Sequence, residues 1–356
     1  MTPSGRRARV ITQFAELGID VLLVTHLPNV RYLSGFTGSN AIFVVAAGGC
    51  TLFTDPRYDI QAGEETDCPV RVVRGALWKS VVPLLAKKRY KRIGIESARM
   101  TVDTYRAIEG KLPLGAALVP LNGVIESARQ VKSPEEIDAV RRAVQTCSAA
   151  FDRALKRFRP GMSELALAAE LDFQMRKGGA ERSSFETIVA SGPRSALPHA
   201  HPTAASIESG PLLVDMGALQ KGYCSDMTRM ATVGPPSPRF RRAYRAVLEA
   251  QLAGVAAVRA GVTAHSVDAA ARRVLRAAGL DQAFVHSTGH GLGLEIHEGP
   301  RLGRGEKARL APGMLVTIEP GVYLEGAFGI RIEDTVLVTA NGSEVLTPTS
   351  KELLAV

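Results

Sequence analysis

Residues 212–217 read Leu212-Leu213-Val214-Asp215-Met216-Gly217, and residues 224–229 read Cys224-Ser225-Asp226-Met227-Thr228-Arg229. An apolar strand-like run ends at Asp215, and Asp226 opens a second run after the turn signal Lys221-Gly222. We therefore predict a β-hairpin over 212–232 with one carboxylate on each arm. Either aspartate alone is most simply a strand-end or turn residue, so the interpretation depends on the rest of the chain.

A second hairpin is predicted over 315–335. Glu319 follows an apolar run and precedes Pro320-Gly321, while Glu333 follows another apolar run. If both hairpins face one core, four carboxylates meet, and such a cluster takes up protons unless cations neutralise it. Two divalent cations would offset the four charges.

A histidine in a glycine-rich segment completes the set. It is His290, in Gly289-His290-Gly291-Leu292-Gly293, and glycines at this density indicate backbone packed close to a site. Four carboxylates and one imidazole suit Mn, Co or Zn better than a soft metal. Two such ions, about 3.5–4 Å apart, would activate a bridging water and polarise a carbonyl group.

The five segments, in their order and spacing, resemble the five metal-ligand motifs of the "pita-bread" metallopeptidases of family M24, which includes methionine aminopeptidases, aminopeptidase P and prolidase. The match extends over 134–356. It implies fold class α/β (α+β), in which an N-terminal creatinase-like α/β domain precedes a pita-bread catalytic domain, a curved antiparallel sheet covered by helices.

The first part of the chain predicts a separate α/β domain. Strand-like and helical patterns alternate through 1–125, and Leu27-Pro28-Asn29 is predicted to be a turn. His26 is most simply a packing or turn residue. A capping signature at Ser133, with proline next and a glutamate three residues after the cap, predicts a helix start. The predicted domains are therefore 1–125 and 134–356, joined by a linker at 126–133.

Segments of the N-terminal domain resemble aminopeptidase P at 32–39 and 54–62. In that family the domain reaches the active site across a dimer, so the resemblance implies a homodimer. Arg57 or Tyr58 could then touch substrate, although a structural use is the simpler interpretation.

The resemblance also implies a role for each site residue. Asp215 would hold one divalent ion, His290 and Glu319 the other, and Asp226 and Glu333 would bridge both. A bridging hydroxide would attack the carbonyl of an Xaa-Pro bond, with Glu319 as general base and then acid. Further roles fall to five residues around the ligands: His199 and His297 would bind the carbonyl and the oxyanion, His286 would orient ligands or line the proline pocket, Arg331 would brace a bridging carboxylate, and Arg301 could bind a product carboxylate or lie on the surface. His201 is expected to face solvent.

Three functions remain open at this stage. An Xaa-Pro aminopeptidase of the aminopeptidase P type, with two divalent ions per subunit and Mn as first choice, is favoured by segments 36–39 and 55–62. An Xaa-Pro dipeptidase, or prolidase, restricted to dipeptides is the first alternative. A non-catalytic pita-bread binding module is the second, and it is disfavoured because all five ligands are present.

The amino-acid composition limits the class of protein, the location and the partners that we expect. The 356 residues are 46% hydrophobic and 22% charged, which predicts a globular chain with a sizeable core, and no apolar run approaches the length of a membrane span. Four scattered cysteines without a Cys-x-x-Cys pair suit a reducing, cytoplasmic location. The basic residues that give the net charge of +9 are interleaved with acidic ones, so we expect neither nucleic acid nor membrane as a partner. Peptides with proline at the second position are the partners that the resemblance implies.

Overall fold

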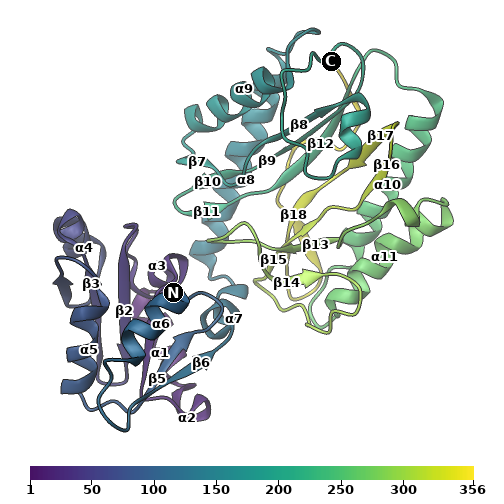
Figure 1. The fold of residues 1–356 in the computed structure, drawn as a ribbon. Helices are drawn as coiled ribbons and strands as arrows, with labels where there is room; N and C mark the ends of the chain where they lie inside the picture. The colour runs from purple at the N-terminus through teal and green to yellow at the C-terminus, as the bar shows by residue number, and fades with distance from the viewer. The chain divides into compact units, whose positions relative to one another are not determined.

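The computed structural model describes all residues, 1–356, and they form two compact units, Met1–Arg129 and Gln130–Val356 (Figure 1). The division falls inside the predicted linker 126–133. Residues 126–130 of that linker are helical, because helix α7 covers Val124–Gln130. No helix in the chain combines the length and the apolar character that a membrane span requires.

The N-terminal unit is a six-stranded mixed sheet with helices. Its strands, in the order β4-β3-β2-β1-β5-β6, are β1 (Val21–Val24), β2 (Ala41–Ala46), β3 (Gly49–Thr54), β4 (Val70–Val72), β5 (Arg92–Glu96) and β6 (Ala117–Leu121). The helices besides α7 are α1 (Pro3–Ile11), α2 (Phe14–Leu17), α3 (Leu27–Ser34), α4 (Asp59–Glu65), α5 (Trp78–Lys87) and α6 (Val102–Glu109). The predicted alternation of strands and helices is confirmed.

One local prediction in this unit is wrong. Leu27-Pro28-Asn29 is not a turn but the first turn of α3, with Pro28 in the first helical positions. Proline is tolerated there because the first amide groups of a helix have no intrahelical acceptor. A proline after a short strand is thus equally compatible with a turn and with a helix start.

The C-terminal unit is built from two small sheets flanked by four helices. One sheet has the order β20-β12-β9-β8 and the other β14-β13-β15-β18-β19. The strands of these sheets are β8 (Ile188–Ser191), β9 (Gly210–Met216), β12 (Met227–Val233), β13 (Gly289–Gly291), β14 (Glu298–Leu302), β15 (Leu315–Ile318), β18 (Asp334–Val338), β19 (Ser343–Val345) and β20 (Leu354–Ala355). The short strands β7 (Arg182–Ser183), β10 (Ala218–Gln220) and β11 (Tyr223–Cys224), and the hairpin of β16 (Gly321–Leu324) and β17 (Phe328–Arg331), complete the unit.

The helices α8 (Pro134–Leu155), α9 (Glu164–Lys177), α10 (Pro238–Ala257) and α11 (Ala264–Ala277) cover these sheets, and Figure 1 shows α10 and α11 side by side. The predicted capping box of Ser133 and Glu136 starts α8. Apolar residues of α8 and α9 pack against Leu212, Val214 and Met216 of β9. Because side chains alternate along a strand, Leu213 and Asp215 project from the opposite face, where Leu213 meets residues of α10.

Candidate active site

The first predicted hairpin places two aspartates beside each other. Strands β9 and β12 pair antiparallel, with Thr228 opposite Asp215. Asp226 directly precedes β12 and shares a strand face with Thr228. Both carboxylates are buried, so the sheet register directs them into the interior of the unit.

The second predicted hairpin brings two glutamates, Glu319 and Glu333, to the same end of a strand pair. Strands β15 and β18 pair with Ile318 opposite Asp334, so Glu319 and Glu333, the next residue on each side, lie at the same end of this ladder. The amide of Glu333 donates to the carbonyl of Thr228 at 3.2 Å, which joins the second hairpin to the first. The two sheets therefore converge at the four carboxylates.

Glycines flanking His290 allow its strand to fit between two neighbours. A Cβ atom on Gly289 would lie 1.9 Å from the carbonyl oxygen of Thr317, and one on Gly291 would lie 2.1 Å from that of Gly299. No side chain fits at such distances, so β13 can approach β14 and β15 only because both positions are glycine. The glycine-rich pattern thus has a steric cause.

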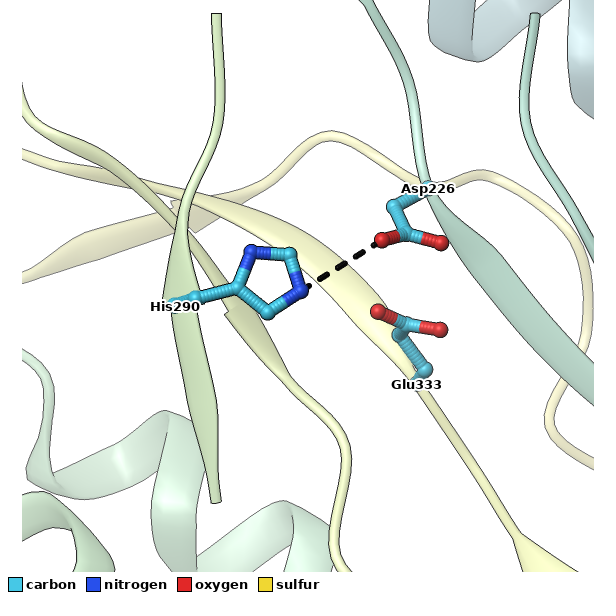
Figure 2. Close-up of side chains that lie close together, drawn as sticks. All are labelled: Asp226, His290 and Glu333. Atoms are coloured by element: carbon cyan, nitrogen blue, oxygen red, sulfur yellow. Dashed lines mark ion pairs between the residues drawn. The ribbon is translucent and has the colours of Figure 1, made fainter. Parts of the chain in front are cut away.

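The imidazole of His290 faces the carboxylates. One ligand atom each from Asp226, His290 and Glu333 lies within 4.8 Å of the others, and Figure 2 shows the ring pointing toward both acids. His290 Nε2 is 3.6 Å from Asp226 Oδ2 and 3.3 Å from Glu319 Oε1. Its Nδ1 is 3.0 Å from the carbonyl oxygen of Gly291, which can only accept, so Nδ1 carries the proton and Nε2 presents a lone pair.

Two carboxylate oxygens in this cluster are buried without any hydrogen-bond partner, Asp215 Oδ1 and Glu333 Oε1. Burial, together with the neighbouring carboxylates, raises the pKa of Asp226 and of Glu333 well above the ordinary value. Buried acceptors without donors are costly, and hard oxygen ligands with one imidazole match divalent cations such as Mn²⁺ or Zn²⁺. The donor set therefore fits the two predicted ions.

Arg331 contacts a different acid from the one that the sequence analysis assigned to it. Its Nη2 donates to Asp215 Oδ2 at 2.6 Å, whereas it reaches Glu333 only through Thr228, whose hydroxyl accepts from Arg331 Nε at 3.0 Å and donates to Glu333 Oε2 at 2.8 Å. Residues two apart on an extended chain are about 6–7 Å apart. The long arginine side chain extends across to β9 instead.

Tyr323, which the sequence analysis did not select, links this arginine to a histidine. Its hydroxyl accepts from Arg331 Nη1 at 2.7 Å and lies 2.9 Å from His286 Nε2. His286 Nδ1 lies 2.8 Å from the carbonyl oxygen of Ser287, so Nδ1 donates and Nε2 accepts the tyrosine proton. A tyrosine in an apolar strand resembles a core aromatic residue, so the sequence carries no separate signal for this role.

A cavity of about 550 Å³ opens over the carboxylates. Its wall contains every predicted site residue: Asp215, Asp226, His290, Glu319, Glu333, His199, His286, His297, Arg301 and Arg331. His297 packs edge-on against His290 with ring centroids 4.5 Å apart, and burial followed by the nearby imidazoles lowers its pKa. His201, also on the wall, is 78% exposed in its side chain and contacts Glu186.

Three residues on the wall of this cavity, His199, Arg301 and Glu319, can take part in binding or chemistry. Neither His199 nor Arg301 has a hydrogen bond or an ion pair within the protein, so both side chains are available to a bound molecule. The side chain of Glu319 is largely shielded from solvent, at 16% exposed, and this desolvation raises its pKa to about 7. The cavity thus combines a divalent-cation donor set, neutral imidazoles and one unpaired guanidinium, which together suit hydrolysis of a carbonyl compound.

Comparisons with known proteins identify the family of this chain. The model of metallopeptidase family M24 matches residues 138–340, and that of the creatinase/prolidase N-terminal domain matches residues 6–131. The chain belongs to metallopeptidase family M24. The predicted family, fold and enzymatic character are thereby confirmed, and membership implies divalent metal ions.

Three relatives illustrate the similarity over the whole chain. An Xaa-Pro dipeptidase of Pyrococcus furiosus is 36% identical over 353 residues, which cover 98% of this chain and 99% of the relative. The structure of an Xaa-Pro dipeptidase from Bacillus anthracis is similar with a TM-score of 0.97 and 39% identity, covering 100% of both chains. That of an X-Pro aminopeptidase from Thermotoga maritima has a TM-score of 0.92 and 36% identity, covering 99% of this chain and 100% of the other.

Proposed function

We propose that this metallopeptidase is an Xaa-Pro dipeptidase that hydrolyses the peptide bond preceding proline. Sequence motifs favour an Xaa-Pro aminopeptidase, but the dipeptidases among the relatives favour the alternative, a dipeptidase. The observation that carries the proposal is Arg301, an unpaired guanidinium on the wall of the cavity that contains the carboxylate cluster.

Five residues would hold two divalent ions, with Mn²⁺ as the first choice: Asp215, Asp226, His290, Glu319 and Glu333. Bound ions would supply Lewis acidity toward the substrate carbonyl and lower the pKa of a water molecule. The unpaired oxygens of Asp215 and Glu333 support this assignment, because only these oxygens in the cluster are buried without a donor.

Glu319 is positioned to move the proton. Thr317 Oγ1 donates to Glu319 Oε1 at 3.1 Å, whereas Oε2 has no hydrogen bond. Oε2 would accept a proton from the attacking water and deliver it to the leaving prolyl nitrogen, which needs a proton to depart as an amine. A carboxylate in contact with both groups performs both transfers.

The imidazoles would stabilise charge that develops on the substrate. His199 and His297 lie on the cavity wall beside the ligand cluster, and a neutral imidazole N–H donates a hydrogen bond to a carbonyl oxygen as it becomes negative. His286 is held by Ser287 and Tyr323 and would form part of the wall around the proline ring.

Arg301 would set the peptide length. In an Xaa-Pro dipeptide the prolyl carboxylate follows immediately after the scissile bond, and a guanidinium binds a carboxylate through strong charge-assisted hydrogen bonds. A longer peptide has a neutral amide at that position. The pairing therefore favours dipeptides.

The test compares an Xaa-Pro dipeptide with an Xaa-Pro-Yaa-Yaa tetrapeptide, using chelator-treated protein to which Mn²⁺ or Co²⁺ is added back. Release of the first residue from the dipeptide, with little release from the tetrapeptide, is expected. Cleavage of the tetrapeptide with equal or higher kcat/KM would instead favour an Xaa-Pro aminopeptidase. The similarity to the Thermotoga maritima structure supports this second candidate. Absence of metal-dependent cleavage of either peptide would refute both candidates.

A further inference from the structure

The loop that carries His199 leaves the sheet at Ser191, the last residue of β8, and returns along the start of α9. The amide of Leu165 donates to the carbonyl of Thr203 at 2.9 Å, and the amide of Glu164 donates to that of Ala205 at 3.0 Å. These bonds use two amides of the first helical turn that have no intrahelical acceptor. The loop 192–202 is thus anchored on the N-terminus of α9.

A buried carboxylate joins the two ends of this loop. Glu164 Oε1 accepts from the amide of Ser191 at 2.8 Å and from its hydroxyl at 3.0 Å, while Oε2 accepts from the amide of Thr203 at 3.1 Å and from its hydroxyl at 2.8 Å. Arg194 Nε donates to Oε2 at 3.0 Å. The side chain of Glu164 is 0% exposed, so these five donors replace its hydration.

The electrostatics agree with a permanently ionised group. Burial alone would raise the pKa of Glu164, but the hydrogen bonds from Ser191 and Thr203 bring it below the ordinary value. Both ends of the loop therefore bind a carboxylate that stays charged. Arg194 extends the connection, because its Nη2 donates to the carbonyl of His201 at 2.6 Å.

The middle of the loop is held from the other half of the unit. The amide of Gly329 donates to Ser195 Oγ at 2.9 Å, and Arg331 Nη1 donates to the carbonyl of Pro198 at 3.2 Å. His199 follows Pro198 directly, and its own side chain has no hydrogen bond. Because no hydrogen bond holds the ring itself, the position of this imidazole in the cavity depends on the backbone of its loop.

We infer that Glu164 is a positioning residue for catalysis: by joining Ser191 to Thr203 it fixes the loop that presents His199 to the substrate. The inference rests on the proposed function, since it assigns His199 to the substrate carbonyl. Glu164 lies on a helix behind the loop and does not line the cavity. It acts through His199 and not on the substrate.

The first experiment follows the loop itself by hydrogen exchange with mass spectrometry. Glu164→Gln keeps the size of the side chain but removes the charge and one pair of acceptor sites. We expect the amides of Ser191 and Thr203, and the peptide that covers 191–203, to exchange at least tenfold faster. The matched control is Glu136→Gln, another buried glutamate, which caps α8 and contacts Tyr223. In that variant the peptide that covers 191–203 should exchange as in the wild type.

The second experiment is a double-mutant cycle on Xaa-Pro hydrolysis. Misplacing a catalytic group by about 1 Å lowers the rate by about 100-fold, so Glu164→Gln should lower kcat by about 10- to 100-fold with little change in KM. In a His199→Ala background the same substitution should lower kcat less than threefold, because the group that it positions is gone. Thr203→Val, which removes one donor to Glu164, should give a smaller decrease in the same direction.

The outcomes separate two kinds of failure. If the wild type hydrolyses no Xaa-Pro peptide while Glu164→Gln still speeds exchange in 191–203, the proposed function is refuted and the mechanical link from Glu164 to the loop is supported. If the wild type is active but Glu164→Gln matches Glu136→Gln in exchange and in kcat, the inference is overturned. Additive effects of Glu164→Gln and His199→Ala would overturn it as well.

Discussion

Glu96 in the N-terminal unit and Glu333 in the C-terminal unit are both buried glutamates, 7% and 1% exposed, but their surroundings differ. Glu96 Oε2 accepts from the amide of Thr25 at 2.6 Å and from that of His26 at 2.9 Å, and Oε1 accepts from Asn29 Nδ2 at 2.7 Å. Glu333 has a single side-chain donor, the hydroxyl of Thr228, and its Oε1 has none.

This difference separates scaffold from site. A buried carboxylate whose oxygens all accept hydrogen bonds stabilises the segments that donate to it, whereas one left without donors costs free energy until a cation binds. Glu164 belongs with Glu96 by this criterion, and Asp215 belongs with Glu333. The number of donors around a buried acid thus indicates its use better than its burial does.

The largest effect should follow from Glu333→Gln. Removing one ligand removes several kcal/mol of electrostatic stabilisation of the transition state, so Xaa-Pro hydrolysis should fall by about 10³-fold. The same variant, free of metal, should unfold at a higher temperature than metal-free wild type, because one of the clustered charges is gone. A metal-free variant that is less stable than the wild type would contradict the comparison.

Glu96→Ala should have the opposite effect on stability. It removes the acceptor of the amides of Thr25 and His26 and of the Thr25 hydroxyl, while Asn29 Nδ2 keeps its bond to Glu126, so the free energy of unfolding should fall by about 2–3 kcal/mol. Trp78, the single tryptophan of the chain, lies in the N-terminal unit, so its fluorescence during denaturation reports on that unit. Metal affinity, measured by calorimetry, should be unchanged. An unaltered denaturation curve would show that a buried carboxylate whose oxygens all accept hydrogen bonds does not stabilise this unit.

The pH dependence of stability provides a further test, because His286 in the C-terminal unit is largely shielded from solvent. Burial, followed by the charge of Arg331, lowers the pKa of His286 to about 4, whereas the unfolded chain has a value of about 6.5. Between these values the unfolded state binds a proton that the native state does not, so stability falls as the pH drops from about 6.5 to 4. Between pH 7 and pH 5, wild type should lose about 2 kcal/mol more than His286→Gln in metal-free urea titrations. Parallel losses in the two proteins would exclude a buried neutral imidazole.

Two arginines give the smallest expected effect. Arg7 in the N-terminal unit donates to the carbonyl of Leu33 and to Asp67, whereas Arg301 has no partner. Arg301→Gln should raise KM for an Xaa-Pro dipeptide by about tenfold through the loss of a charge-assisted hydrogen bond. Arg7→Gln should change stability and not KM. An Xaa-Pro amide, which lacks the carboxylate, serves as control substrate, and a similar rise in its KM would argue against carboxylate binding.

The sequence alone predicted the two acid-bearing hairpins, the start of α8 and the family. These features depend on short-range signals: an apolar run that ends in an acid, a turn dipeptide, and a capping box whose members are three residues apart. Short-range signals can still be ambiguous. The turn predicted at Leu27-Pro28-Asn29 is wrong, because proline is compatible with both a turn and the first turn of a helix.

Only the tertiary structure decided which groups meet. Arg331 lies two residues from Glu333 in the sequence, but it pairs with Asp215 on another strand. Tyr323 and Glu164 look like a core aromatic residue and a residue of a helical first turn until their partners are known. Whether a buried acid is saturated by donors depends on amides contributed by distant segments, and that information exists only once the chain has folded.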